Sequence, residues 1–375
     1  MDKNASKIIS QNTTTHYYEK PPFTINQIRK SIPPHCFHRS LLRSFSYLLH
    51  DLTISFIFYH IAHNYFHLLP KPFSYIAWPI YWFAQGSIMF GLWVLGHESA
   101  HNAFSDYKWL DDIVGLVIYS SLLVPYYSFK TSHKRHHANT GSLENEEVYV
   151  PRKRENIQWY FSKYFNNPPG RVLTLFITLI LGWPLYLLFN VSGKKYERFA
   201  SHYDPYGPIH GKSAQVLISD IGVFVTLYGV YRFAIAHGFV HMICMYGIPL
   251  VVVNMFVVLV TYLHHTHPSV PYYDSSEWNW LRGALSTIDR DYGTIMNKIF
   301  HHCTDAHVIH HLFASMPHYN AREATEAIKP ILGAYYQSDN TPFHKALWRE
   351  AKECLYVVAD KREHHKGVWW YSNKL

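Results

Sequence analysis

The chain has 375 residues, of which 28 are histidines, 17% are aromatic and only 16% are charged. In soluble domains about a quarter of all residues are usually charged. The composition therefore excludes a chain made only of ordinary soluble domains. The formal net charge of +8 favours polar parts that face an anionic cytoplasmic membrane surface. The basic residues are scattered among apolar segments rather than gathered in one stripe, which argues against nucleic-acid binding.

The N-terminal residues 1–45 are expected to form a cytosolic segment. Their first twenty residues are polar and contain no apolar core of the kind a secretory signal has, so no cleavable signal peptide is predicted. The four cysteines of the chain lie far apart and form no CxxC pair. Neither a disulfide framework nor a zinc knuckle is therefore predicted, and a reducing compartment is the simpler interpretation.

Four apolar segments are long enough to cross about 30 Å of hydrocarbon. They cover residues 46–68, 73–95, 216–236 and 243–263. The first is the least regular because it contains His50 and Asp51, whereas the second has no charged residue. Short links with at most one Lys or Arg join the segments in two pairs, and the positive-inside rule predicts that these links are lumenal.

Two shorter apolar stretches, 113–127 and 173–191, are harder to place. If they crossed the membrane, histidine-rich segments would no longer share one side, so we expect interfacial or re-entrant helices. The predicted fold is an all-α integral membrane protein with four transmembrane helices in two hairpins and a cytosolic histidine-rich cap. Residues 46–375 are expected to form one domain, whose tail is cytosolic from residue 264 onwards.

Three histidine clusters lie in the segments that are predicted to be cytosolic. They comprise His97 and His101; His133, His136 and His137; and His307, His310 and His311. Within each cluster the residues are spaced at i, i+3 or i+4, which places them on one face of a helix. We therefore expect each cluster to direct its imidazoles at one point, so that eight neutral nitrogen donors form a shared metal centre.

Eight imidazoles are too many for one tetrahedral zinc ion, which takes four ligands. They suit two metal ions with open positions, and imidazole accepts zinc, copper, iron or nickel. A centre at the membrane surface would meet acyl chains, whose C–H bonds require O₂ activated at a redox metal, and zinc has no redox chemistry. We therefore expect two iron ions, with Glu98 and Asp305 as candidate acceptors for the N–H groups of ligand imidazoles.

A ninth candidate ligand lies just after the fourth span, where three histidines are equally available by spacing, although a single histidine at such a place is more often a surface residue than a ligand. These are His264, His265 and His267. Other histidines lack the cluster spacing and are expected to stay outside the centre, among them His301, His302 and His318.

Short segments beside the clusters add a more specific signal. They are Ala103-Phe-Ser-Asp-Tyr107, Ala138-Asn-Thr-Gly-Ser-Leu143, Glu147-Val-Tyr-Val-Pro151, Ser275-Ser-Glu-Trp278, Trp280-Leu-Arg-Gly-Ala-Leu285, Asp289-Arg-Asp-Tyr292 and Met316-Pro-His-Tyr-Asn320. Together with the clusters, they resemble the plant microsomal Δ12 oleate desaturase family over nearly the whole chain, from about residue 33 to the C-terminus.

This resemblance implies an acyl-lipid desaturase of the endoplasmic reticulum membrane that uses O₂ and takes electrons from cytochrome b5. The implied substrate is an 18-carbon acyl chain on phosphatidylcholine, attacked near carbon 12. In the family pattern, the eight cluster histidines and His265 hold the two irons. The C-terminal Tyr371, Lys374 and Leu375 belong to a stretch that resembles the family's aromatic retention signal.

Four positions near the clusters are candidates for tuning the product. The first cluster of ordinary family members resembles HECGHH, so Ala100 and Asn102 depart from that pattern. Gly96 stands where ordinary members have Ala, and resembles the divergent acetylenase, conjugase, hydroxylase and epoxygenase branch. Ile309 is bulkier than the usual Ala. Such changes can shift an acyl chain, and positioning dominates reactivity.

Several functions are open at this point. The first is a desaturase that forms a double bond near carbon 12, or a triple or conjugated bond on an unsaturated substrate. The second is a hydroxylase or epoxygenase on the same di-iron scaffold. A non-enzymatic membrane metal carrier is disfavoured, because a carrier places polar residues inside its spans. A membrane zinc hydrolase is a more distant alternative.

Overall fold

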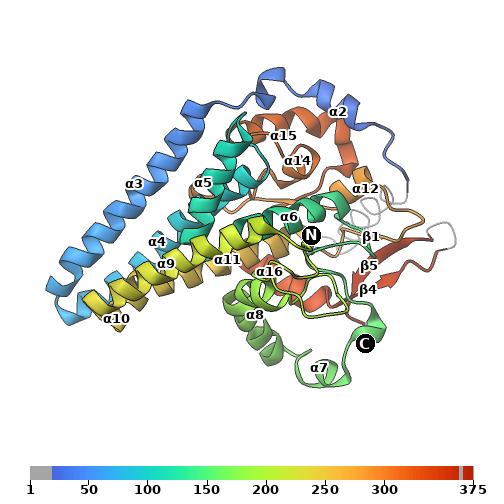
Figure 1. Ribbon diagram of the computed structural model, residues 1–375. Helices are drawn as coiled ribbons and strands as arrows, with labels where there is room; N and C mark the ends of the chain where they lie inside the picture. Colours follow the sequence, from blue (N-terminus) through green and yellow to red (C-terminus); the bar gives the residue numbers. More distant parts are fainter. Residues whose placement is uncertain (1–18, 363–365, 375) are drawn as a thin grey trace.

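The computed structural model describes residues 19–362 and 366–374, so Leu375 of the predicted retention signal lies outside the described residues. The chain is mostly helical, as predicted, with two small sheets that were not predicted. Long helices extend together to one end of the molecule, and shorter helices and the sheets gather at the other (Figure 1). We refer to this second part as the cap.

The first helical hairpin consists of α3 (Leu41–Tyr65) and α4 (Lys71–Ala100). The side chain of Ser40 caps the first turn of α3 by accepting the backbone N–H of Arg43, as N-cap serines commonly do. A short 3₁₀ turn at Phe66–Leu68 and Pro70 separate the two helices. The hairpin covers the predicted spans 46–68 and 73–95, and the end of α4 reaches the cap.

The second hairpin begins with α9 (Ala214–His237) and continues through α10 (Phe239–Met242) and a π-helical turn at Ile243–Gly247 into α11 (Ile248–His265). Gly238 has φ of 92°, a conformation that glycine adopts without steric cost, and it breaks the chain between α9 and α10. The predicted spans 216–236 and 243–263 both fall within these helices.

The two shorter apolar stretches, 113–127 and 173–191, form different structures. The first, 113–127, is not one helix, because α5 (Lys108–Ser121) and α6 (Tyr126–Asn139) meet at a bend of 108°. The second becomes α8 (Pro168–Phe189). Of the described helices, α8, α9 and the continuous segment Phe239–His265 are long and apolar enough to cross a membrane, and the α5–α6 pair would make a fourth. α3 and α4, which cover the predicted spans 46–68 and 73–95, are long enough but do not reach the same hydropathy.

The cap is built from short elements that come mainly from the C-terminal third. Its helices and helical turns are α2 (Ile25–Ser31), the 3₁₀ turn Pro34–Phe37, α12 (Trp280–Ala284), α13 (Thr294–Ile299), α14 (His307–Leu312), α15 (His318–Leu332), the 3₁₀ turn Gly333–Tyr335 and α16 (Phe343–Glu353). A further 3₁₀ turn, Arg154–Asn156, and α7 (Trp159–Tyr164) precede α8.

Two small sheets complete the cap. An antiparallel sheet has the order β1 (Tyr272–Tyr273), β5 (Val368–Ser372) and β4 (Tyr356–Ala359), and a parallel pair joins β2 (Asp289–Arg290) to β3 (Ser338–Asp339). Tyr371 lies in β5, with its hydroxyl 3.3 Å from that of Tyr272. Part of the predicted retention signal is therefore built into a sheet.

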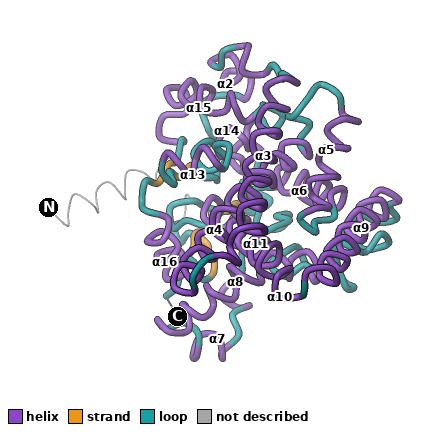
Figure 2. The backbone as a smooth tube through the Cα atoms, turned by 90° about the vertical axis from the view of Figure 1, so that its left-hand side faces the viewer, coloured by secondary structure: helices purple, strands orange, loops and turns teal. Residues whose placement is uncertain are grey.

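The main core lies where α4 and α11 cross, with α8 packed against α11 and α5 against α4. Phe90 and Phe300 form an edge-to-face pair there, which links α4 to the cap. Figure 2, a view turned by 90°, shows α4 and α11 near the middle of the molecule and α9 at one side. This packing brings the ends of α4 and α11 to the same place under the cap.

Candidate metal centre

Four helices direct nine histidines into the space under the cap. α4 and its C-cap, α6, α11 and α14 supply His97, His101, His133, His136, His137, His265, His307, His310 and His311. All nine are histidines expected from the sequence, and the structure brings them together. Their imidazoles do not meet at one point, however, but form two neighbouring groups.

The first group contains five histidines whose ring nitrogens lie within 4.8 Å of one another: His97, His101, His133, His137 and His310. Nε2 of His133 lies 2.7 Å from Nε2 of His97 and 3.2 Å from Nε2 of His137. Nε2 of His137 is in turn 3.1 Å from Nε2 of His310. Imidazoles from α4, α6 and α14 thus converge on one small volume.

The second group is centred on His265, the last residue of α11. Its Nε2 lies 3.3 Å from Nε2 of His136 and 3.0 Å from Nε2 of His307, and His311 completes the group. The ring of His311 stacks on that of His137 with centroids 4.1 Å apart, which places the two groups side by side. His136 and His137 serve different groups because consecutive helical residues point about 100° apart.

The chemistry of these nine side chains fits two imidazole-bound metal ions. Nε2 of His101 and Nε2 of His311 are buried without a hydrogen-bond partner, which is costly unless a ligand satisfies them. Burial, with a smaller effect of neighbouring imidazoles, holds the pKa of His310 at about 3 and that of most of the others well below the usual value. The rings with a lowered pKa are therefore neutral, as metal binding requires.

The structure separates the three histidines that were equally available after the fourth span. Only His265 points into the second group. Both ring nitrogens of His264 are engaged by backbone carbonyls, at 2.5 Å from Val260 O and 2.8 Å from Thr304 O. His267 accepts the backbone N–H of Ser269 and faces an ion-pair network instead.

The polar residues that support the imidazoles differ from those expected. Nδ1 of His136 lies 2.6 Å from Oε1 of the buried Glu146, and Nδ1 of His311 lies 3.3 Å from the hydroxyl of Thr140. Glu146 was missed by the sequence analysis. The only signal for it was its place among the acidic residues that follow α6.

The two acceptors that were expected have other partners. Glu98 accepts the backbone N–H of His318 at 2.9 Å, and its carboxyl lies 3.9 Å from Nδ1 of His97, beyond hydrogen-bond distance. Burial raises the pKa of Glu98 to about 8. Asp305 binds His302 and Arg322.

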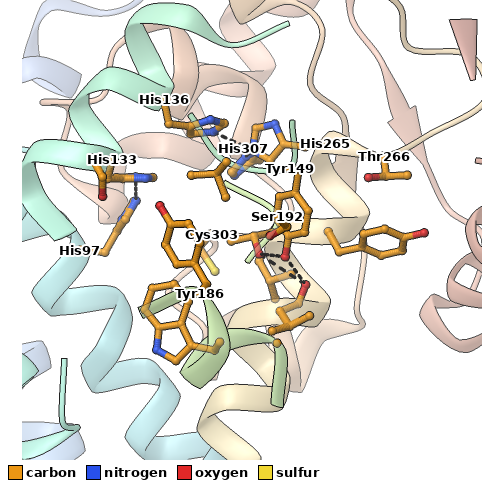
Figure 3. Close-up of a pocket in the computed structure, with 18 of the residues that line it drawn as sticks. His97, His133, His136, Tyr149, Tyr186, Ser192, His265, Thr266, Cys303 and His307 are labelled. Atoms are coloured by element: carbon orange, nitrogen blue, oxygen red, sulfur yellow. Dashed lines mark hydrogen bonds between the residues drawn. The ribbon is translucent and has the colours of Figure 1, made fainter. Parts of the chain in front are cut away.

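A cavity of about 410 Å³ opens beside the two groups, a size within the range of roughly 300–1,000 Å³ that is usual for ligand sites. Figure 3 shows His97, His133, His136, His265 and His307 at one end of it, with Tyr149, Tyr186 and Ser192 further along. Much of the wall is apolar and comes from α4, α6, α8 and α11, with residues such as Trp93, Val94, Phe129, Ile177, Trp183 and Val258. The histidine-lined face therefore meets a space suited to a hydrocarbon chain.

The four candidate tuning positions lie around the centre without lining this cavity. Gly96 faces the ring of Tyr119, and a Cβ atom there would overlap the ring. Ala100 and Ile309 are buried in the core on either side. Asn102 follows the end of α4 with φ of 54°, a left-handed conformation that asparagine tolerates. Its side chain accepts from Lys130 Nζ at 3.4 Å, so the nine imidazoles gather without a contribution from position 102.

A family model described as fatty acid desaturase matches residues 75–343, a range that includes every histidine of both groups. The chain belongs to the fatty acid desaturase family. It is therefore an oxidoreductase, and the apolar helices and histidine-rich centre fit a membrane enzyme of fatty-acid metabolism.

Individual relatives in this family are similar over nearly their whole length. The chain is 65% identical to a Δ(12)-fatty-acid desaturase of Vernicia fordii over 96% of this chain and 94% of the relative. It is 62% identical, over the same shares, to an omega-6 fatty acid desaturase of Glycine max described as an endoplasmic reticulum isozyme. An oleoyl-12-hydroxylase of Ricinus communis is 58% identical over 95% of this chain and 92% of the relative. Relatives that are named for different products are thus almost equally similar to this chain.

Proposed function

We propose that the chain is a Δ12-type acyl-lipid desaturase with two iron ions. The first iron would be held by His97, His101, His133, His137 and His310, and the second by His136, His265, His307 and His311. The supporting observation is the convergence of nine imidazoles in two adjacent groups beside an apolar cavity. When bound there, iron supplies the redox chemistry with O₂ that methylene C–H cleavage needs, which zinc lacks.

The residues of the chain would bind and orient the acyl chain. The substrate is proposed to be an 18-carbon acyl chain on phosphatidylcholine, with carbon 12 held beside the two histidine groups. Apolar side chains such as Trp93, Phe129 and Val258 line the part of the cavity that would hold the acyl chain, and a fixed geometry favours one pair of methylenes over the others. The similarity to a Δ(12)-fatty-acid desaturase supports this choice of position.

The electron donor is proposed to be cytochrome b5, and the membrane that of the endoplasmic reticulum. The net charge of +8 suits a cap on the cytosolic face, where a soluble donor domain has access. The proposed topology has two transmembrane hairpins and both termini in the cytosol. In this topology α5, α6 and α8 lie against the bilayer. The similarity to an endoplasmic reticulum isozyme supports the location, and the C-terminal stretch with Tyr371 and Lys374 remains the proposed retention signal.

The nature of the new bond depends on how the acyl chain is held. Gly96 is proposed to act on this indirectly, because the ring of Tyr119 that fills its place stacks on Trp93 with centroids 5.8 Å apart, and Trp93 lines the cavity beside His97. Which of these products forms, a double bond, a triple bond or a conjugated system, therefore depends on the packing of residues directly behind the cavity wall. Ala100, Asn102 and Ile309 would act at still longer range.

A hydroxylase or epoxygenase is the second candidate function, and the 58% identity to an oleoyl-12-hydroxylase supports it. Desaturation and hydroxylation both begin by removing hydrogen from the same methylene, and they differ in whether a second hydrogen leaves or oxygen is transferred. An epoxygenase instead transfers oxygen to an existing double bond. The two functions therefore share the iron ligands, and only the product distinguishes them.

Expression in yeast, with fatty acids analysed by gas chromatography and mass spectrometry, tests these functions. A diene formed from supplied oleate supports the Δ12 desaturase. A triple bond or conjugated triene from linoleate supports the divergent branch, and a hydroxy acid supports the second candidate. The variant His136→Ala, made at the same level, should give no product. Formation of product by that variant would contradict the assignment of the ligands.

A further inference from the structure

A buried carboxylate connects the first transmembrane hairpin to the cap. Asp51 lies on α3 and is 2% exposed. Its Oδ1 lies 3.0 Å from Nδ1 of His50, and its Oδ2 lies 2.7 Å from Nε2 of His301. Gly91 of α4 makes room for this pair, because a Cβ atom at that position would lie 2.9 Å from Asp51 Oδ2 and 3.4 Å from His301 Nε2. Ionisable residues inside membrane helices are rare and usually functional.

The outer end of this arrangement lies at the surface of the protein. The side chain of His50 is 63% exposed. It lies four residues, or about 6 Å along a helix, after the predicted start of the first span, so it is close to the cytosolic edge of the hydrocarbon region. An amphipathic imidazole at this depth can reach interfacial water with its polar edge, whereas Asp51 is buried.

The inner end faces the cavity beside the metal-binding histidines. His301 is 3% exposed, and its Nδ1, the nitrogen that does not face Asp51, has no hydrogen-bond partner. The same holds for Nε2 of His318, whose ring centroid lies 4.8 Å from that of His301. Both residues line the cavity, where water can bridge to these nitrogens.

The backbone at the inner end is held in an unusual conformation. His301 and the residue after it, His302, have φ of 50° and 60°. Non-glycine residues rarely adopt positive φ, and such strain is concentrated at functional sites. Tyr47 contacts both inner rings edge-on, and Tyr319 contacts His318. Burial lowers the pKa of His318, with smaller effects of His301, His302 and Arg43 in that order.

The proposed reaction requires protons from solvent. Conversion of –CH₂–CH₂– to –CH=CH– with reduction of O₂ to two waters takes two electrons from reduced cytochrome b5 and two protons from water. Two C–H bonds and the O–O bond break, and one C=C bond and four O–H bonds form. A cavity with an apolar wall does not itself conduct these protons, so a polar route from the surface is needed.

We propose that His50, Asp51 and His301 form the proton-delivery route to the cavity, with His318 at its inner end. This inference rests on the proposed desaturation. A proton taken up by His50 passes to the carboxylate of Asp51 and then to Nε2 of His301. Because an imidazole can accept a proton on one nitrogen and release another from the second, His301 delivers a proton from Nδ1 to cavity water.

The first test compares Asp51→Asn with wild type, using iron-loaded full-length enzyme in phospholipid nanodiscs with reduced cytochrome b5. An amide keeps the size of the side chain and can still form hydrogen bonds, but it cannot carry the proton. We expect unchanged iron content and melting temperature, turnover lowered about 100-fold and a larger solvent deuterium isotope effect. Asp220→Asn, in a buried aspartate of α9, is the matched control and should behave as wild type.

Chemical rescue separates a proton route from a structural role. His50→Ala should lower turnover, and added imidazole should restore it, because a small base can replace an exposed proton acceptor. Asp51→Asn should not be rescued. Wild-type turnover and isotope effect in Asp51→Asn, or no response of His50→Ala to imidazole, would overturn the proposal.

A second measurement does not depend on catalysis. In full-length protein loaded with zinc and labelled with ¹⁵N-histidine, nuclear magnetic resonance reports exchange of the His301 N–H proton with water, and His301→Gln identifies its signal. Exchange should slow in Asp51→Asn and His50→Ala but not in Asp220→Asn. Equal exchange in all of them would overturn the proton route. If wild-type enzyme forms no product but exchange slows as expected, the proposed function fails while the route stands.

Discussion

Nδ1 of His136 lies 2.6 Å from Oε1 of Glu146, a carboxylate that is 3% exposed. The second carboxylate oxygen accepts the backbone N–H of Gly141 at 3.1 Å, so the turn after α6 fixes the position of Glu146. This contact sets the tautomer of His136 and directs its Nε2 toward His265. Such carboxylate–histidine pairs orient metal ligands and strengthen them as donors.

Replacing Glu146 with Gln should weaken the second iron site without unfolding the chain. The loss of this partner is expected to lower iron affinity or activity by about 10–100-fold. Metal analysis of the purified protein measures the effect as iron bound per chain. Glu144→Gln, at an exposed position two residues earlier, is the matched control, and an equal loss in both variants would contradict the role of Glu146.

The position of His265 predicts a difference between two neighbouring histidines. His265→Ala removes an imidazole whose Nε2 lies close to those of His136 and His307, so we expect loss of iron from the second group and loss of product. His267→Ala should retain both, because His267 faces Asp339 at 3.8 Å instead. Iron content and product formation are measured together. Iron retained by His265→Ala would show that the second group is wrongly assigned.

Gly96→Ala should disturb packing behind the cavity. The added methyl overlaps the ring of Tyr119, and overpacking of this kind typically costs about 1–3 kcal/mol. We expect a lower melting temperature in detergent and an altered ratio of products from linoleate. Gly229→Ala on α9 is the control, because nothing lies within 4 Å of a Cβ atom there. Equal melting temperatures and product ratios for the two variants would argue against tuning through Tyr119.

The cap should depend on one buried cation. Arg290 is 1% exposed and forms ion pairs with Asp339 and with Glu350, the latter at 2.6 Å. Arg290→Met leaves Arg349 as the remaining partner of Asp339 and Glu350, so the cost should approach but not exceed the roughly 3–5 kcal/mol that is typical of breaking a buried ion pair. Thermal unfolding should show a much lower midpoint than for Lys329→Met, which removes a more exposed pair with Glu326. Similar midpoints for the two variants would mean that the buried ion-pair network contributes little to the stability of the cap.

The regular features of the fold could be predicted from the sequence. Apolar length identified the long helices, although their ends differ: the span predicted at 216–236 is a helix from Ala214 to His237. Spacing identified all eight cluster histidines, because helical periodicity acts over three or four residues. The bend between Ser121 and Tyr126 was not predicted, since the apolar stretch continues across it.

Features that depend on contacts between distant segments could not be predicted in this way. Glu146 reaches His136 through a turn, and His301 and His318 meet the cavity only because α13, α14 and α15 fold over α4. Both histidines were expected to lie outside the metal centre, because neither has the spacing of the clusters. The periodicity of a single helix carries no information about contacts between distant segments.

The metal content of the purified chain tests the central claim most directly. Protein made with iron available, and analysed by elemental mass spectrometry against protein concentration, should contain two irons per chain. Replacing His265 should reduce this number, while replacing His267 should not. A chain that forms the fatty-acid product with fewer than two metal ions, or with zinc in place of iron, would contradict the account.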